Sequence, residues 1–285
     1  MSTQISPSLV QDLELKSVRY RKTILSMIKH AHSGHTGGSL SCVDILNVLY
    51  NYVLNVNPHF PKDPDRDRYI HSKGHSVEAL YTVLSDRGFL PHEELFTFEK
   101  YSSRLIGHPT REVPGIEQNT GALGHGLSVA VGMALAAKKD QRQYRVFTLL
   151  GDGELTEGSI WEACLSATHY CLDNLVVIVD RNGLQITGPT EKVMRLEPLE
   201  EKFKAFGFAV ESVNGNSIPA LIQVFDRVPF ERGKPNLILA LTTKGKGISF
   251  MENDATWHHR VPNDLEYQQA IQELEWAENQ LMENR

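Results

Sequence analysis

Residues 145–153 read RVFTLLGDG, and residues 175–182 read LVVIVDRN. Each segment begins as a short apolar run and ends in polar residues, with Asp152 after the first run and Asn182 after the second. Continuous apolar runs of this kind are typical of strands covered on both faces of a parallel sheet. A helical stretch at 159–170 separates them, and Asp152 and Asn182 are 182 − 152 = 30 residues apart. That spacing predicts one β-α-β unit with both side chains at the same edge of the sheet.

The alternation of strands and helices continues on both sides of this unit. Further strands are predicted at 69–72, 209–213 and 237–242. Helices are predicted at 8–30, 43–53, 77–87, 127–139, 198–206, 218–228 and 264–284. The glycine-rich segment HSGHTGGSLS at 32–41 is expected to interrupt the helical pattern between the first two. This order indicates an α/β fold, a doubly wound parallel sheet with helices on both faces. We expect one domain over residues 1–285, because no linker or repeat divides the chain.

The composition of the chain narrows the class of protein. Its 285 residues carry a formal net charge of -6 at pH 7, which argues against nucleic acid as the main partner. The N-terminal segment is charged throughout, and no apolar run approaches the roughly 20 residues that span a membrane. The cysteines, Cys42, Cys164 and Cys171, fit a reducing compartment better than a disulfide framework. We therefore expect a cytoplasmic protein that binds neither nucleic acid nor membrane.

Asp152 and Asn182 offer a carboxylate and an amide oxygen at one sheet edge. Hard oxygen ligands suit Mg²⁺ or Ca²⁺ rather than zinc, and Mg²⁺ usually completes its shell with water and phosphate oxygens. Gly153 leaves room for a phosphate to approach the backbone N–H, and a helix that begins near residue 158 adds its positive end. The two segments therefore predict a metal-bound diphosphate.

A simpler interpretation competes with this one. Asp-Gly and Asn-Gly are common turn dipeptides, so Asp152 and Asn182 could belong to turns without any ligand. The flanking buried strands and the spacing between the two residues favour a ligand site. Other phosphate motifs are absent, because the chain contains no G-x-x-x-x-G-K-[ST] and the glycines of TGALGHGLS do not match G-x-G-x-x-G.

Histidines are frequent, and several lie in glycine-flanked loops. Examples are His35 in SGHTGG, His75 in SKGHS, His108 in IGHP, His125 in GHG, and His258 and His259 in TWHHR. Loops often carry binding groups, and a neutral imidazole can bond to a phosphate or a sugar hydroxyl and can transfer a proton near neutral pH. Taken singly, each is better explained as a solvated loop residue, and no pair has the H-E-x-x-H spacing of a zinc site.

Read together, these motifs resemble those of the transketolase family. The chain carries HSGHTGGSLS, DRYIHSKGHSVEALY, GHP, TGALGHGLSVAVGMALA, GDGELTEGSIWEA, VDRNGLQITG and TTKGKGISFMEN followed by WHH, in that order, between about residues 10 and 270. The resemblance is to the amino-terminal part of the family, which binds thiamine diphosphate. It is greatest to the split form, in which this part is a separate polypeptide. It implies the thiamine-diphosphate-binding fold and its diphosphate-binding domain.

The resemblance also implies roles for individual residues. It assigns the metal ligands to Asp152, Asn182 and the backbone carbonyl of Leu184. It assigns contacts with thiamine diphosphate to His75, Gly121, Leu123, Gly153, Glu157, Asn182 and His258, with Glu157 at the contact between the two halves of the site. It assigns hydrogen bonds to sugar hydroxyls to His35, His108 and His258, of which His35 and His258 are the expected bases for the C3 hydroxyl proton.

Three positions depart from the family pattern. Thr36 stands where the family usually has proline, and His125 where it usually has glutamine. His259 stands in place of the usual glycine after the C-terminal histidine. This last change leaves open whether His258 or His259 fills the role beside the cofactor.

The implied reaction is the transfer of a two-carbon ketol unit from a ketose phosphate to an aldose phosphate. It depends on thiamine diphosphate and Mg²⁺, with Ca²⁺ or Mn²⁺ as substitute metals, and belongs to pentose phosphate metabolism. The family's activating glutamate lies in a pyrimidine-binding domain. We therefore expect the partner to be a C-terminal transketolase subunit that carries this domain, in an α2β2 heterotetramer.

Three alternatives remain from the sequence. The first is the α-type subunit of a 2-oxo-acid dehydrogenase, which shares GDG…N but is not expected to carry the SGHTGG, SKGH and GHP histidines. The second is a specialised sugar-catabolic transketolase with a different donor ketose phosphate. The third is a module that binds the cofactor without catalysis.

Overall fold

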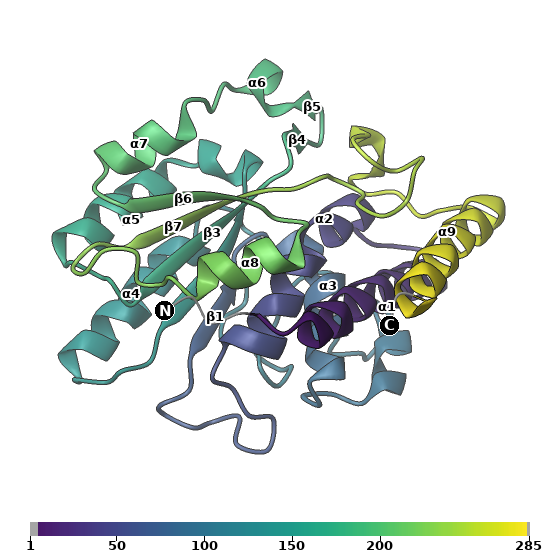
Figure 1. Cartoon of the computed structure of the whole chain (residues 1–285), viewed down its shortest axis with the longest axis horizontal. Helices are drawn as coiled ribbons and strands as arrows, with labels where there is room; N and C mark the ends of the chain where they lie inside the picture. Colours follow the sequence, from purple (N-terminus) through teal and green to yellow (C-terminus); the bar gives the residue numbers. More distant parts are fainter. Residues whose placement is uncertain (1–4, 284–285) are drawn as a thin grey trace.

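Five parallel strands form the central sheet of the protein (Figure 1). The computed structural model describes residues 5–283, and its main strands are β1 (Arg68–His71), β2 (Val146–Gly151), β3 (Leu175–Arg181), β6 (Ala209–Asn214) and β7 (Asn236–Leu241). The order across the sheet is β1-β2-β3-β7-β6, and every neighbouring pair is parallel. The strands β2 and β3 are therefore direct neighbours, as the β-α-β spacing predicts.

Alternate residues of each strand face two separate apolar cores. In β3, Val176 and Ile178 pack into one core, whereas Val177 and Val179 pack into the other. All four are fully buried. A strand buried on both faces needs apolar residues at every position, which explains why these segments read as continuous apolar runs.

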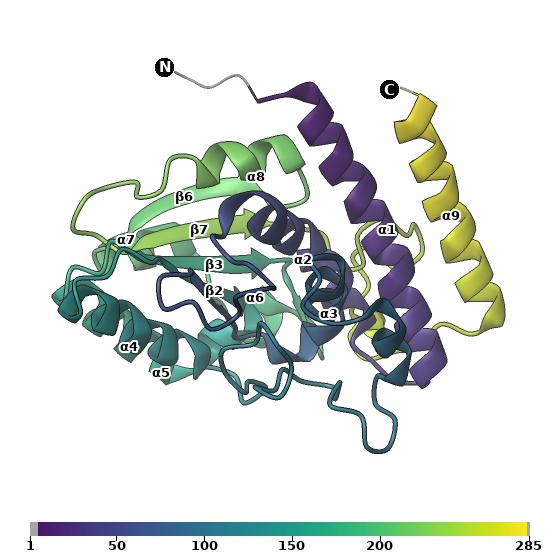
Figure 2. The same cartoon turned by 90° about the horizontal axis from the view of Figure 1, so that it is seen from below.

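Helices cover both faces of the sheet, which confirms the predicted α/β class. One face carries α4 (Gly126–Lys139), α5 (Gly158–His169) and α7 (Leu199–Ala205). The other face carries α2 (Thr36–Val48), α3 (Val77–Asp86) and α8 (Ile218–Phe225). In Figures 1 and 2 the two groups of helices lie on opposite sides of the strands.

The first and last helices lie side by side, outside α2 and α3 (Figure 2). These are α1 (Pro7–Ala31) and α9 (Asp264–Glu283). Ion pairs of 2.7 Å from Arg19 and 2.6 Å from Lys22 to Glu278 join them. The predicted C-terminal helix is thus confirmed, although its last predicted residue, Asn284, lies outside the described residues. No helix within residues 5–283 is long and apolar enough to cross a membrane.

The prediction that residues 32–41 interrupt the helical pattern is wrong over most of its length. The helix α2 begins at Thr36, contains both Gly37 and Gly38, and passes into a π-helical turn at Leu49–Val53. A Cβ on Gly37 would lie 2.9 Å from the carbonyl oxygen of Trp257, so tertiary packing requires glycine inside this helix. The local cost of glycine in a helix is offset here because every residue of α2 is buried.

Several short elements were not predicted. A small antiparallel hairpin consists of β4 (Leu184–Gln185) and β5 (Gly188–Pro189), and α6 (Thr190–Val193) follows it. Figure 1 shows the three elements together at one side of the molecule. Short 3-10 helices occur at Gly74–Ser76, His92–Thr97, Gly153–Thr156 and Ala255–Trp257.

Candidate active site

A cavity of about 460 Å³ opens where β2 and β3 end. Asp152 directly follows β2, and Asn182 directly follows β3. Both side chains line the cavity, as predicted. The other predicted site residues that line it are His35, His75, Gly121, Leu123, Gly153, Leu184 and His258. The topology therefore gathers residues from widely separated sequence motifs around one space.

Two predicted residues, His108 and Glu157, do not line the cavity but lie close to residues that do. The ring of His108 is 6.1 Å from that of His35, and a Cβ on Gly121 would lie 2.6 Å from Cδ2 of His108. Glu157 is exposed and packs against Gly124. Both residues thus lie beside the site rather than in the wall of the cavity.

Asp152 is buried and hydrogen-bonded through both carboxylate oxygens. Its Oδ1 accepts the N–H of Gly153 at 2.8 Å, and its Oδ2 accepts the N–H of Gly183 at 2.6 Å and Nη1 of Arg181 at 3.1 Å. Burial raises the pKa of Asp152, and the nearby charge of Asp180 adds to this effect. Because Oδ1 has one donor only, it keeps a lone pair that a cation could use.

The donor set at Asp152 and Asn182 fits a hard divalent metal that needs further ligands from elsewhere. Within residues 5–283, no group of three or more histidine, cysteine, aspartate or glutamate side chains is arranged to hold a metal. One carboxylate and one amide would therefore need phosphate or water oxygens to complete a shell, which is the usual situation for Mg²⁺. The N–H of Gly153 already pairs with Asp152, so its bond to a phosphate stays a prediction.

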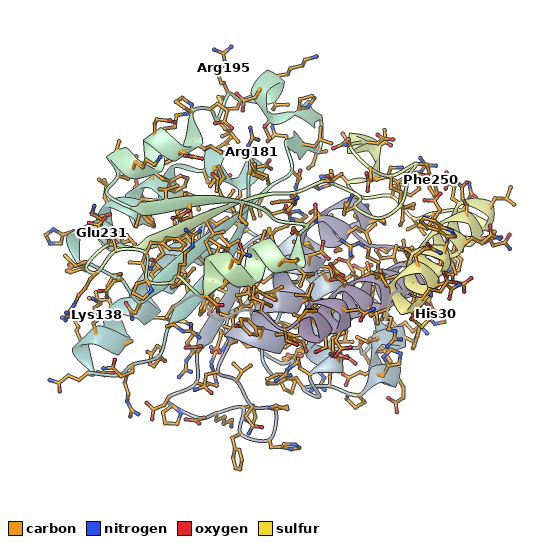
Figure 3. The ribbon with its side chains drawn as sticks, viewed as in Figure 1. His30, Lys138, Arg181, Arg195, Glu231 and Phe250 are labelled. Atoms are coloured by element: carbon orange, nitrogen blue, oxygen red, sulfur yellow. The ribbon has the colours of Figure 1, made fainter. Side chains whose placement is uncertain are left out.

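Arg181 connects the metal-site carboxylate to the α6 region. Its guanidinium bonds to Asp152, to Thr190 at 2.7 Å, and to Glu191 and Glu197 at 3.1 and 3.0 Å. Figure 3 shows Arg181 on the same side of the molecule as α6. The residue immediately precedes the predicted site residue Asn182, but nothing in the DRN motif itself indicated a contact with Asp152.

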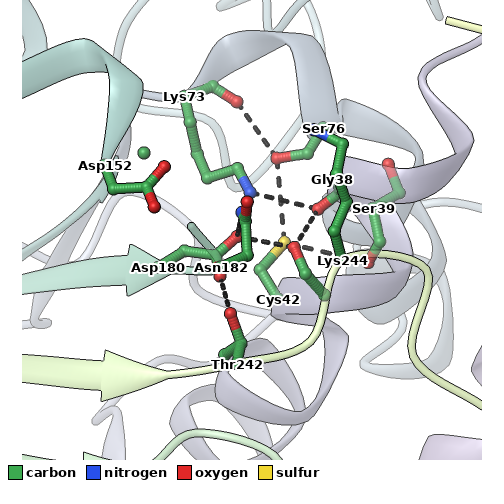
Figure 4. A network of polar contacts seen from close by, with 12 residues as sticks. Gly38, Ser39, Cys42, Lys73, Ser76, Asp152, Asp180, Asn182, Thr242 and Lys244 are labelled. Carbon is green, nitrogen blue, oxygen red and sulfur yellow. Dashed lines mark hydrogen bonds and ion pairs between the residues drawn. The ribbon is translucent and has the colours of Figure 1, made fainter. Parts of the chain in front are cut away.

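A buried ion pair that the sequence did not reveal lies beneath the cavity. The ammonium of Lys73 contacts Asp180, which also accepts hydrogen bonds from Ser41 at 2.6 Å and from Thr242 (Figure 4). Burial opposes both charges, but the mutual attraction prevails, so that the pKa of Lys73 is raised and that of Asp180 is lowered. Both side chains are therefore charged, and each charge is compensated by the other. The SKGH motif thus contributes its lysine to this ion pair as well as its histidine to the cavity.

Lys244 is a second buried cation, and it has no such partner. Its side chain lines the cavity, its Nζ lies 3.1 Å from Nδ1 of His258, and no carboxylate of residues 5–283 forms an ion pair with it. Burial lowers the pKa of Lys244 to about 8, and the charge of Lys73 contributes. A buried ammonium without a counter-ion is unfavourable. The cavity is therefore suited to an anionic ligand.

Histidine rings surround the cavity mouth. The ring centroid of His35 lies 5.4 Å from that of His75, 5.5 Å from that of His258 and 4.4 Å from that of His259. Burial, with smaller contributions from the neighbouring histidines, lowers the pKa of His35 to about 3. Burial and the charge of Lys244 lower the pKa of His258 to about 4. The rings of His35 and His258 are therefore neutral at pH 7 and can donate or accept hydrogen bonds.

The structure distinguishes the positions of His258 and His259. His258 lines the cavity and stacks on His75, with ring centroids 5.2 Å apart. His259 is exposed and contacts the edge of His35 instead. Of these two histidines, only His258 is thus placed to contact a ligand in the cavity directly.

Comparison with known proteins identifies relatives along nearly the whole chain. The family model described as the thiamine diphosphate binding domain of transketolase matches residues 15–283. An apulose-4-phosphate transketolase subunit from Phocaeicola vulgatus is 49% identical over 265 residues, which are 93% of this chain and 94% of that protein. The 6-deoxy-6-sulfo-D-fructose transketolase subunit SqwG of Clostridium sp. is 40% identical over 93% of this chain and 96% of that protein.

Longer transketolases match over part of their length only. Human transketolase is 37% identical over 93% of this chain but only 42% of its own length. The transketolase structure from Campylobacter jejuni superposes with a TM-score of 0.84 at 30% identity, over 96% of this chain and 48% of that one. The chain therefore spans about half the length of these longer relatives.

Proposed function

The chain belongs to the transketolase family, and on that premise we propose that it is one subunit of a split transketolase that uses thiamine diphosphate and a divalent metal. It would transfer a two-carbon ketol unit from a ketose phosphate to an aldose phosphate. The observation that carries the proposal is the buried ammonium of Lys244, which has no carboxylate partner among residues 5–283 and lies in the same cavity as Asp152 and Asn182.

The residues around the cavity fit the diphosphate of the cofactor. Asp152, Asn182 and the carbonyl of Leu184 would hold Mg²⁺, with Ca²⁺ or Mn²⁺ as substitutes, and the metal would bind the diphosphate. Lys244 and the N–H of Gly153 would add positive potential, and His75, Gly121 and Leu123 would contact the remainder of the cofactor. When bound, thiamine diphosphate supplies the nucleophile and the electron sink for breaking a carbon–carbon bond.

The histidines would act on the sugar. His35, His108 and His258 would hydrogen-bond the substrate hydroxyls, and His35 or His258 would take the proton of the C3 hydroxyl. Because burial lowers the pKa of His35 to about 3 and that of His258 to about 4, both rings are unprotonated at pH 7 and are weak bases in the free chain. A bound anion nearby would raise these values and make the rings stronger bases.

A partner subunit would supply what this chain does not offer. Asp152 and Glu154 are the carboxylates among the described residues that line the cavity. Glu154 is fully engaged by Ser72 and by the N–H groups of Gly124 at 2.9 Å and Gly151 at 3.1 Å. Neither carboxylate is free to activate the aminopyrimidine ring. A C-terminal subunit with a pyrimidine-binding domain would provide that group, in an α2β2 heterotetramer, with Glu157 at the contact.

The relatives' names favour a specialised ketose over the general pentose phosphate reaction. One of the relatives described above is named for apulose-4-phosphate and another for 6-deoxy-6-sulfo-D-fructose. We infer that the donor substrate is a related unusual ketose phosphate of sugar catabolism. We also propose that the chain forms one domain over residues 1–285 and acts in the cytoplasm.

The experiment that tests the proposal is reconstitution. Ketol transfer would be assayed with thiamine diphosphate and Mg²⁺ for the chain alone and for the chain with its candidate C-terminal subunit. The substrates would be a series of ketose phosphates and pyruvate. Turnover of a ketose phosphate that requires both subunits supports the proposal. Turnover of pyruvate would instead indicate a 2-oxo-acid dehydrogenase, and cofactor binding without turnover would indicate a non-catalytic module.

A further inference from the structure

Glu78 is a buried carboxylate close to the cavity that the proposed function does not use. It is the second residue of α3, has an exposed fraction of 0%, and forms no ion pair with any cation of residues 5–283. An unpaired buried carboxylate is costly, so its surroundings must either stabilise the charge or hold the group neutral. Its hydrogen-bond partners show what the carboxylate holds in place.

Both oxygens of Glu78 bind the start of α2. Oε1 accepts the backbone N–H of His35 at 2.7 Å, and Oε2 accepts the hydroxyl of Ser39 at 2.7 Å. His35 is the residue immediately before α2, so the carboxylate lies at the positive end of that helix. It satisfies an N–H that the helix itself leaves without a partner.

The turn before His35 is shaped around this carboxylate. Gly34 has a φ of +145°, and a Cβ at this position would lie 2.6 Å from Oε1 of Glu78. Glycine is therefore required for the backbone to approach the carboxylate so closely. The glycine of the SGH motif and the carboxylate of α3 together fix the direction in which the His35 side chain leaves the backbone.

We propose that Glu78 is a positioning residue for His35: its ionised carboxylate fixes the turn that directs His35 into the cavity, and its protonation loosens that turn. A charge-assisted hydrogen bond is about twice as strong as a neutral one, so protonation weakens the bond to the His35 N–H without removing it. The inference rests on the proposed function only for what His35 does to a sugar. The coupling between Glu78 and His35 involves residues of this chain only, so it can be tested without a partner subunit or a substrate.

The surroundings of Glu78 place its titration in the neutral range. Burial raises the pKa of Glu78 to about 7, and Glu99 contributes in the same direction, whereas the N–H of His35 and the hydroxyl of Ser39 oppose the shift. Tyr81, on the same helix, faces the carboxylate as well, but its pKa is raised far above neutrality by burial and by Glu78 itself.

The titration of Glu78 must be distinguished from that of the other groups that face His35. His35 has its own pKa lowered to about 3 by burial, so its ring does not titrate near pH 7. Burial also lowers the pKa values of His108 and His258. Lys244 titrates above neutrality, with its pKa at about 8. The exposed His259, whose ring centroid is 4.4 Å from that of His35, also faces this ring and therefore needs its own control variant.

The test is a pH titration of the His35 ring by NMR with histidines labelled at Cε1, using His35→Asn to assign the resonance. The wild-type signal is expected to inflect near pH 7. Glu78→Gln should abolish this inflection, whereas His259→Asn and Asp86→Asn, a change to the exposed end of α3, should leave it. An inflection that survives Glu78→Gln, disappears in His259→Asn, or is absent from the wild type would overturn the proposal.

A second variant keeps the test decisive if Glu78→Gln does not fold. Ser39→Ala removes a donor that lowers the pKa of Glu78, so the inflection should move to higher pH. An unchanged inflection would contradict the proposal. In the two-subunit complex, kcat/KM should rise with pH through about 7 in the wild type. It should stay at the low-pH value in Glu78→Gln, with unchanged cofactor affinity. If ketol transfer is not the function, only this activity result is lost and the NMR result still decides.

Discussion

The ammonium of Lys244 lies 3.1 Å from Nδ1 of His258, and both groups line the cavity at the ends of β2 and β3. This contact joins a cation suited to an anionic ligand to an imidazole suited to a sugar hydroxyl. It places the two halves of the proposed chemistry, anchoring and proton transfer, within one hydrogen bond of each other.

Lys244→Met should separate the effect of the cation on ligand binding from its effect on stability. Removing a charged partner of a buried anion costs about 1.5–3 kcal/mol, so thiamine diphosphate should bind roughly 10- to 150-fold more weakly by calorimetry. The free protein should not lose stability at pH 7, because an uncompensated buried charge has been removed. Lys246→Met, a half-exposed lysine paired with Glu252, is the matched control. Equal cofactor affinity in the two variants would contradict the role of Lys244.

The pH dependence of the free protein should report the same lysine. The pKa of Lys244 falls from 10.5 to about 8 on folding, so between these values the unfolded chain binds more protons than the folded one. Stability from this group therefore rises with pH across that window. Chemical denaturation at pH 7.5 and pH 10 should show a rise in the wild type that is smaller in Lys244→Met. Parallel curves for both proteins would show that the lysine is not buried as a cation.

His258 and His259 should differ in their effects on catalysis. General acid–base catalysis by one side chain is worth about 10²–10⁴-fold, so His258→Ala should reduce kcat/KM of the two-subunit enzyme by at least about 100-fold. His259→Ala should reduce it by less than about tenfold, because His259 is exposed and reaches the cavity only through His35. The reverse order of effects would assign the cofactor-side role to His259.

Glu78→Gln should increase the free energy of unfolding by an amount that grows with pH. The pKa of Glu78 rises from 4.5 to about 7 on folding, so between these values the folded chain binds the extra proton and stability falls as pH rises. The glutamine variant lacks this loss and should gain up to about 3 kcal/mol over the wild type at pH 8, with little difference at pH 4.5. Urea denaturation at the two pH values measures this. A constant difference between the two proteins would indicate packing alone.

The fold was predictable because its signals are local. RVFTLL and LVVIVD are apolar at nearly every position, and only a sheet covered on both faces buries every residue of such a run. The spacing between them predicted that Asp152 and Asn182 lie at the same edge of the sheet, since neighbouring parallel strands end at one edge. The start of α2 was not predictable, because Gly37 and Gly38 are unfavourable in a helix by local rules. Only the tertiary contact with the carbonyl of Trp257 requires glycine at position 37, and a Cβ on Gly38 would lie 3.3 Å from His75.

The buried charged residues in and near the cavity could not be recognised from sequence. A lysine or glutamate is usually exposed, so Lys73, Lys244 and Glu78 carry no mark of burial until the chain folds around them. Lys73 and Lys244 do lie in the SKGH and TTKGKG motifs, and this was the one local signal for them. The histidine loops were easier to identify, because most of them are flanked by glycine.

Calorimetric titration of thiamine diphosphate into the wild type and Asp152→Ala, each with Mg²⁺ and with a chelator, tests the central claim most directly. Asp65→Ala, which removes an exposed aspartate paired with Arg142, is the control. We expect Mg²⁺-dependent binding in the wild type and the control, and its loss in Asp152→Ala with the far-ultraviolet circular dichroism unchanged. Mg²⁺-dependent binding of equal affinity in Asp152→Ala would contradict the assignment of this site.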